Sequence, residues 1–362
     1  MVVRRLWILL LLLGSFPTLA VDDPIMITHI PHPSGAFRAD ILLENRASES
    51  RLLEMTVYDA LGADLGTTTQ MVPANQVLLL DSASLHENGT AAYAVLTPDA
   101  PLEMGITYSN AATPNAVAYQ PALSRPAKIW RFNQADAAQL FEGLVFVNPE
   151  CGAINLTLHQ TQRDGTPILS EPLALEETSK KLVLVLSTYL DNHPGSVITI
   201  ESSDLLYATA LRGDHNGGTQ FLGTNHLRTL DPWQEARERM VKSRARWQAS
   251  GLTDSYTYVL DATCSCPEAA VLPARIAVRY GQIVSATDMS TGEALDPRTF
   301  GDLLTVDDVF NRAAAALDGS YTDILLEYDD DLGYPTLIGL NPKRCLIDDE
   351  TNYTISELEG LR

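Results

Sequence analysis

Two short stretches decide how this chain folds: ILLEN at residues 41–45 and LVFVN at residues 144–148. Each is an alternating apolar run that ends in an asparagine, Asn45 in the first copy and Asn148 in the second. The same layout therefore occurs twice, about a hundred residues apart. An internal repeat of this length predicts tandem modules rather than one enzyme core.

The residues around these stretches continue the pattern in both copies. Short alternating apolar runs follow at residues 53–57, 77–80, 91–96, 104–108 and 117–119 in the first copy, and at residues 156–158, 182–186, 197–200 and 205–211 in the second. Period-two alternation interrupted by turn residues is typical of an antiparallel β-sandwich. We therefore predict two β-sandwich repeats, residues 21–125 and 126–229, joined by a short linker rich in proline.

The two asparagines are interpreted as structural residues. A glycine, Gly62 or Gly165, follows each asparagine at the same distance, as expected for a conserved turn within the repeat. Asparagine side chains bond to nearby backbone groups in turns. We therefore expect Asn45 and Asn148 to cap turns, and a ligand-binding role is the alternative.

The pattern changes at Asp231, where a C-terminal domain is predicted over residues 230–362. Asp231 and Pro232 are typical of a helix start, and Trp233, Met240 and Trp247 then recur at helical spacing. We expect this helix, residues 232–250, to bury all three side chains.

A second helix and a set of strands complete the C-terminal domain. Thr305 is expected to cap the second helix, with Asp308 at its third position. Alternating runs around residues 256–260, 276–280, 283–286, 324–328, 336–340 and 352–358 predict strands. Helices covering one face of an antiparallel sheet form an α+β domain. The fold class is thus multidomain, with two all-β sandwiches followed by an α+β domain.

The first residues indicate export. Arg4 and Arg5 precede the apolar run 6–13, and small residues follow up to Ala20, which is the pattern of a secretory signal peptide. We expect residues 1–20 to be removed, leaving no transmembrane segment and a periplasmic or extracellular protein. A formal net charge of −21 argues against nucleic acid as a partner, because binding phosphates requires clustered Lys and Arg.

Both parts of the chain resemble known bacterial domains. The repeats resemble immunoglobulin-like sandwich modules of exported bacterial proteins, in which a strand ending in Asn-Pro leads into a turn; the second copy has Asn148-Pro149, and the first keeps only Asn45. The C-terminal region resembles a bacterial domain of unknown function found in exported proteins and lipoproteins. The residues that carry this resemblance are, in order, Trp247, GLTDSYTY at 251–258, CSCP at 264–267, Tyr328-Asp329, GYP at 333–335 and DDE at 348–350. The resemblance implies an exported α+β module with no established activity.

Four cysteines are candidates for disulfide bonds in an oxidising compartment: Cys151, Cys264, Cys266 and Cys345. Four cysteines allow three connectivities, so their pairing stays open. A bridge between Cys264 and Cys266 would close a very small, strained and easily reduced ring. Cys345 paired with either of them would close a long loop and stabilise the domain more. A structural bridge and a redox-active pair are the two alternatives.

Acidic residues in the C-terminal domain form a possible cation site. Asp329, Asp331, Asp348 and Asp349 lie in two acidic clusters, and calcium binds several carboxylate oxygens together. EF-hand spacing is missing, however, and solvated turn residues are the alternative. No other cofactor is expected.

The first C-terminal helix also carries five basic residues: Arg237, Arg239, Lys242, Arg244 and Arg246. They could form an anion-binding face. Because acidic residues are interleaved with them, we interpret them as a solvated face with intramolecular ion pairs.

The mature sequence lacks the common hydrolase, nucleotide-binding and dinucleotide-binding motifs. We therefore expect a non-enzymatic binding or scaffolding protein of the bacterial envelope or exterior, with a protein or glycan partner. The alternative is a thiol-redox or otherwise catalytic C-terminal domain on a β-sandwich stalk. The identity of the partner, the disulfide connectivity and the oligomeric state stay open.

Overall fold

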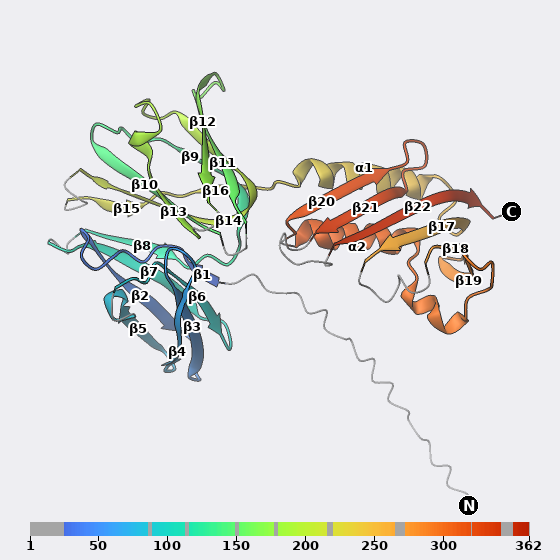
Figure 1. Cartoon of the computed structure of the whole chain (residues 1–362), viewed down its shortest axis with the longest axis horizontal. Coiled ribbons are helices and arrows are strands. Elements are labelled where there is room, and N and C mark those ends of the chain that lie inside the picture. The colour runs from blue at the N-terminus through green and yellow to red at the C-terminus, as the bar shows by residue number, and fades with distance from the viewer. Residues whose placement is uncertain are drawn as a thin grey trace, which may run out of the picture.

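The structure is a computed structural model that describes residues 25–361 except 86–88, 113–115, 149–151, 177–179, 216–219, 265–271, 320 and 342–349. It is mostly β, with 53% strand and 13% helix, several antiparallel sheets and two α-helices. Figure 1 shows two β-rich bodies beside each other and a third body that contains both helices. The expected signal peptide, residues 1–20, lies outside the described residues.

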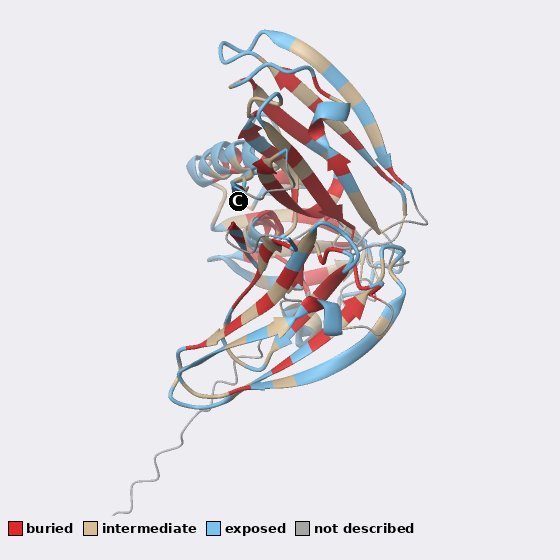
Figure 2. Ribbon diagram, turned by 90° about the vertical axis from the view of Figure 1, so that its left-hand side faces the viewer, coloured by how far each residue is buried: buried red, intermediate tan, exposed pale blue. Residues whose placement is uncertain are grey.

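The N-terminal segment, residues 25–121, contains two four-stranded sheets in the orders β1-β6-β3-β4 and β5-β2-β7-β8. Its strands are β1 (Ile25–Ile27), β2 (Phe37–Asn45), β3 (Arg51–Tyr58), β4 (Asp64–Val72), β5 (Gln76–Asp81), β6 (Tyr93–Pro98), β7 (Glu103–Asn110) and β8 (Val117–Pro121), with a 3-10 turn η1 (Ser82–Ser84). Apolar side chains from both sheets share one core, to which β2 contributes Ile41 and Leu43, each fully buried. Figure 2 shows buried and exposed positions alternating along these strands.

The middle segment, residues 127–230, repeats this arrangement. Its elements are β9 (Ala127–Asn133), β10 (Leu140–Val147), β11 (Ile154–Thr161), β12 (Pro167–Leu175), β13 (Lys181–Val185), η2 (Leu186–Thr188), β14 (Val197–Asp214), β15 (Leu222–Thr224) and β16 (Arg228–Leu230). The long strand β14 pairs with β9 and β11 through its first half and with β10 and β15 through its second half. In the middle segment the single strand β14 thus occupies the positions that two strands, β6 and β7, occupy in the two sheets of the N-terminal segment.

The repeat seen in the sequence is present in the strand order of both segments. β9, β11, β12 and the first half of β14 pair as β1, β3, β4 and β6 do, and β10, β13, β15 and the second half of β14 pair as β2, β5, β8 and β7 do. The turn glycines also agree, since φ is 87° at Gly62 and 89° at Gly165. The two segments are therefore copies of one topology.

The capping prediction for the two asparagines is confirmed. Asn45 Nδ2 donates to the carbonyl oxygen of Glu49 at 2.8 Å, and Asn148 Nδ2 donates to that of Gly152 at 3.1 Å, four residues ahead in both cases. Both asparagines are buried. A buried amide stabilises a turn only when its hydrogen bonds are made, so the same contact is kept in both copies.

The N-terminal and middle segments share a buried interface. Met26 and Tyr93 pack with Val147 and Tyr207 in one apolar cluster. The Lys181 ammonium donates to the Ala92 carbonyl oxygen at 2.7 Å across this boundary. Residues of the middle segment, including Leu211 and Leu222, also belong to the N-terminal core. The two copies therefore pack against each other rather than lying apart as separate units.

The C-terminal segment is built on a six-stranded antiparallel sheet in the order β19-β18-β17-β22-β21-β20. Its elements are α1 (Gln234–Ala249), β17 (Ser255–Thr263), β18 (Ala274–Arg279), β19 (Gln282–Asp288), η4 (Pro297–Asp302), α2 (Val306–Asp318), β20 (Asp323–Tyr328), β21 (Pro335–Asn341) and β22 (Thr351–Gly360). Both helices pack with the sheet in one hydrophobic core, and Figure 1 shows them behind the strands.

The two helices differ in how well the sequence predicted them. Thr305 and Asp308 form the expected reciprocal cap of α2, and the apolar stripe of that helix is buried. The first helix begins at Gln234 rather than Pro232, because Asp231 instead bonds the Trp233 amide and closes a turn before the helix. Met240 and Trp247 are buried as predicted, whereas Trp233 is only partly buried and packs against the edge of the same core.

Within the described residues, no helix combines the length and apolar character needed to cross a membrane.

Candidate functional site

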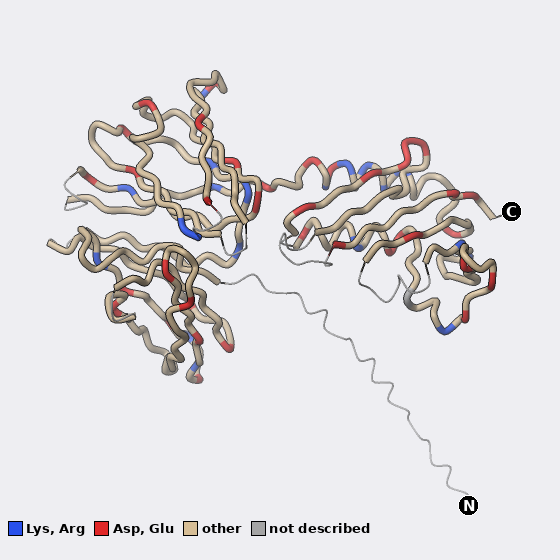
Figure 3. The backbone as a smooth tube through the Cα atoms, viewed as in Figure 1, with Lys and Arg blue, Asp and Glu red and all other residues tan. Residues whose placement is uncertain are grey.

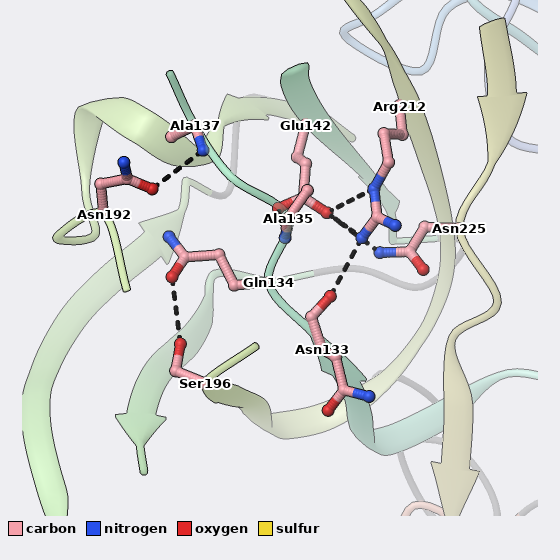
Figure 4. Close-up of polar contacts among 9 residues, drawn as sticks. All are labelled: Asn133, Gln134, Ala135, Ala137, Glu142, Asn192, Ser196, Arg212 and Asn225. Carbon is pink, nitrogen blue, oxygen red and sulfur yellow. Dashed lines mark hydrogen bonds and ion pairs between the residues drawn. The ribbon is translucent and has the colours of Figure 1, made fainter. Parts of the chain in front are cut away.

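The most concentrated polar cluster of the middle segment is structural. The Glu142 carboxylate accepts from the Ala135 amide at 2.8 Å through Oε2, and from Arg212 Nε at 2.9 Å and Asn225 Nδ2 at 3.2 Å through Oε1 (Figure 4). Beside it, Gln134 Oε1 accepts from the Ser196 hydroxyl at 3.0 Å. Both oxygens of the buried carboxylate are engaged within the chain, so this cluster stabilises the loop between β9 and β10.

A large hollow lies where the middle segment meets the C-terminal segment. This junction cleft has a volume of about 890 Å³. Its walls come from the linker before β9, strand β16, the start of α1 and the chain after α2. Its lining includes Arg125, Leu230, Asp231, Trp233, Arg237, Asp318 and Tyr321. Binding sites often lie between structural units, so the junction cleft is the candidate functional site.

One wall of the junction cleft is held by ion pairs. Arg237 Nε donates to Asp231 Oδ2 at 3.1 Å, and the same guanidinium also bonds the Asp318 carboxylate and the Leu317 carbonyl oxygen. Arg237 thereby ties the end of α2 to the turn before α1. A planar guanidinium with several donors suits such a multiple contact, and it keeps this wall in place.

Trp233 forms a second wall and links the two segments. The Lys128 ammonium on β9 lies 5.4 Å from the centroid of the Trp233 ring and donates to the Thr322 carbonyl oxygen at 2.6 Å. The Lys128 side chain is only 12% exposed. A cation over an aromatic ring is attracted to it, more strongly when water is excluded. Lys128 thus orients the ring that the sequence pattern had placed in the core.

The third wall carries an unpaired strand edge. Among the described strands β16 pairs with β9 alone, and Thr229 and Leu230 of this strand line the cleft. From β16 the chain runs directly into α1 (Figure 1). An edge strand presents free backbone N–H and C=O groups that can pair with another extended chain.

The predicted cysteine sites are described only in part. Cys264, the one cysteine within the described residues, is disulfide-bonded. Cys151, Cys266 and Cys345 lie outside the described residues, so no pair is described there. The connectivity, and the choice between a structural and a redox-active bridge, stay predictions.

The predicted calcium ligands are also described in part. Asp329 Oδ1 accepts from the amides of Asp331 at 3.0 Å and Leu332 at 2.7 Å, so this carboxylate caps its own turn. Asp331 is exposed in the same turn. Asp348 and Asp349 lie outside the described residues. Among the described residues no group of three or more metal-ligating side chains occurs, and a calcium site remains a hypothesis.

One arrangement in the middle segment was missed by sequence reasoning. His159 on β11 lies 3.2 Å from the Ser170 hydroxyl on β12 through Nδ1 and 3.8 Å from the Glu201 carboxylate on β14 through Nε2. A catalytic histidine needs an acid that holds its ring by a hydrogen bond. The Glu201 carboxylate is too far from the ring for a hydrogen bond, and its side chain is 56% exposed. Ser170, His159 and Glu201 therefore form a cross-strand contact on the surface of the sheet.

Comparison with known proteins concerns mainly the C-terminal segment. Residues 239–360 match a "Family of unknown function (DUF6174)", which supports the predicted likeness of this segment to a domain of unknown function. No curated protein matches the chain.

Solved structures add little to this comparison. The chain is similar to Bacteroides uniformis beta-glucuronidase with 12% identity and a TM-score of 0.15, covering 57% of this chain and 26% of that one. A calcium-binding mutant of Bacteroides uniformis beta-glucuronidase 2 gives 10% identity and a TM-score of 0.15, with the same coverage. The chain thus spans about a quarter of the length of these structures. At these TM-scores the similarity indicates neither a shared fold nor a shared activity.

Proposed function

We propose that the chain is an exported, non-enzymatic binding protein of the bacterial envelope or exterior, and that the junction cleft holds an extended segment of a partner polypeptide. The observation that carries the proposal is the cleft of about 890 Å³, with an unpaired strand edge, partly buried aromatic rings and charges of both signs in its walls. In this proposal the two repeats are immunoglobulin-like modules that support the cleft.

The lining of the cleft favours a polypeptide over a glycan. The free edge of β16 offers backbone hydrogen bonds that an extended peptide satisfies by adding a strand. Trp233 and Tyr321 offer apolar ring surface for its side chains, and aromatic residues are common anchors in protein interfaces. Arg125 is exposed in the same cleft, so an acidic side chain of the partner finds a counter-charge there.

The packing of the chain gives the cleft a firm base. The N-terminal and middle segments share a buried interface, and Lys128 and Arg237 fix the C-terminal walls by the contacts described above. A binding site held in place before the ligand arrives loses less conformational entropy on association. Export is supported by the signal-like first 20 residues and by an acidic chain that is expected to stay soluble outside the cell.

Selection of random peptides on the full mature chain, followed by fluorescence anisotropy, tests the proposal. We expect selected peptides to bind at least about tenfold more weakly to Trp233→Ala and to Arg125→Glu, because loss of one anchor contact costs roughly 1.4 kcal/mol or more. Tyr280→Ala is the matched control, since this ring is 91% exposed in a hairpin turn outside the cleft. Selected peptides whose affinity is the same for all variants would refute the cleft as the site. If no peptide binds and the protein binds a glycan array in a way that depends on Trp233, the ligand of the cleft is a glycan and not a polypeptide.

A further inference from the structure

A second candidate site lies inside the C-terminal segment, in a groove between α1 and the edge strand β20. This groove has a volume of about 420 Å³. It is lined by Arg239, Lys242, Ser243, Arg246, Leu326, Glu327, Tyr328, Asp330 and Thr336. The four α1 residues follow one another at helical spacing along one face. Figure 3 shows Lys and Arg gathered along α1 in a chain whose formal net charge is −21.

The five basic residues of α1 fall into two groups. Arg237 forms ion pairs with Asp231 and Asp318, and Arg244 lies 3.8 Å from Asp307 and donates to Asn311 at 3.0 Å. For these two, the interpretation as intramolecular pairs is confirmed.

The remaining three basic residues are those that line the groove. Arg246 donates to a neutral carbonyl oxygen, that of Asp330, and to the Ser243 hydroxyl. Arg239 and Lys242 are exposed and take part in no ion pair with any residue that the structure describes. Three cations therefore converge on the groove without a bonded carboxylate.

Tyr328 and Thr336 line the groove from the strands of the sheet. The Tyr328 ring stacks on Phe310 of α2, with centroids 5.9 Å apart and planes inclined by 16°. Its buried hydroxyl has no hydrogen-bond partner among the described residues. Thr336 on β21 adds a second hydroxyl.

The turn after β20 explains how the groove keeps its shape. Gly333 has φ of 79°, and a Cβ atom there would lie 2.3 Å from the Ser243 carbonyl oxygen and 2.8 Å from Arg246 Cβ. The turn therefore packs directly on the face of α1 that carries the cations. Only glycine allows both this backbone conformation and this close approach.

We infer that this groove binds a small molecule carrying a phosphate-type oxyanion, held by Arg239, Lys242 and Arg246. Guanidinium groups match the geometry of phosphate oxygens, and the ammonium and hydroxyl groups complete the donor set. Glu327 and Asp330 also line the groove, and their negative charges repel the anion. Removing one of these charges should therefore increase the affinity for the anion. The groove is separate from the junction cleft, and either site can fail without the other.

Isothermal titration of the full mature chain with inorganic pyrophosphate at low salt is the test. We expect saturable binding that weakens at least about tenfold in the double variant Arg239→Gln, Lys242→Gln, since each charge-assisted contact contributes a factor of this order. Glu327→Gln should strengthen binding about two- to fivefold by removing a repulsive charge. Arg298→Gln is the matched control, because it removes one positive charge from a side chain that is 91% exposed elsewhere on the same segment.

Three results would overturn the inference. The first is the absence of saturable heat when pyrophosphate is added to wild-type protein. The second is a loss of affinity in Arg298→Gln as large as that in the double variant. Binding only to phosphatidylglycerol vesicles, without pyrophosphate binding, would assign the cations to a membrane surface instead. Unchanged melting temperatures of the variants check that each one is folded.

Discussion

His29 allows a quantitative prediction about the interface between the N-terminal and middle segments. Burial, with a smaller effect of the Lys181 charge, lowers the pKa of His29 from 6.5 to about 3. Its ring stacks on Tyr108 with centroids 5.8 Å apart, and Nδ1 is buried without a partner among the described residues. The imidazole is therefore neutral in the folded protein at any pH above about 3.

The sign of the effect follows from proton linkage. In the unfolded chain His29 has its ordinary pKa of 6.5, so between pH 6.5 and pH 3 the unfolded chain binds a proton that the folded chain does not. The free energy of unfolding must then fall as the pH falls, by about 1.4 kcal/mol for each pH unit. This contribution is fully present above pH 6.5 and is lost progressively down to the folded pKa.

The perturbation that isolates this effect is His29→Phe, which keeps an aromatic ring beside Tyr108 and removes the titrating nitrogen. Calorimetry of the full chain should show that the melting temperature of these two segments falls faster with acidity in the wild type than in the variant. For about 200 residues the difference should grow by roughly 3–6 °C per pH unit between pH 6 and pH 4. His32→Phe is the control, because this ring lies exposed in the same loop. Parallel melting curves for wild type and His29→Phe would refute the reasoning.

Four further predictions follow from the same structure. Burial lowers the pKa of Lys181 from 10.5 to about 7, so wild-type stability relative to Lys181→Met should rise by about 1.4 kcal/mol per unit between pH 7 and pH 10, and flat pH profiles would contradict this. Trp247→Ala empties a fully buried site and should destabilise the C-terminal segment by about 3–5 kcal/mol in urea unfolding, whereas an unchanged midpoint would place the ring at the surface. Gly333→Ala should cost about 2 kcal/mol or more in the same assay because of its positive φ and the close Ser243 carbonyl, and a neutral result would show that the turn can move away from α1. Proteolysis in the linker at residues 122–126 should leave the N-terminal and middle segments together on gel filtration, because they share buried clusters, and their separation would contradict that interface.

The proteolysis experiment also bears on the predicted domain boundaries. The sequence predicts divisions near residues 125 and 229; residue 229 falls within strand β16 (Arg228–Leu230), and the division into three domains stays a prediction. If the shared interface governs stability, the first two repeats will unfold in one transition and the C-terminal segment in another. Three separate unfolding transitions, one for each predicted domain, would show that the interface between the first two repeats is weak.

Much of the local structure could be predicted from the sequence. The alternating runs around Ile41 and Leu144, the capping asparagines and the Thr305 cap all depend on interactions within one strand, turn or helix. Alternation tells which face of an element is buried, and a cap needs only residues three or four positions apart. These signals therefore require no knowledge of distant contacts.

The candidate sites could not be predicted in the same way. Trp233 has the spacing of a core residue, yet the Lys128 side chain of another strand holds it at the junction cleft. Arg239 and Lys242 resemble the other cations of their helix until the positions of Asp318 and Asp307 show which cations are paired. Each distinction depends on which partner reaches a side chain from far along the chain.

The sequence by itself determined the repeat, the strand-rich composition and the start of the second helix, because periodicity and short-range hydrogen bonds are local properties. Only the tertiary structure decided that the two copies share a core, that His29 and Lys181 lose solvation and interact with each other, and that an edge strand lines the junction cleft. Burial and charge pairing are properties of the packed chain. They arise when elements separated by many residues exclude water from the same space, and no local pattern records which elements will do so.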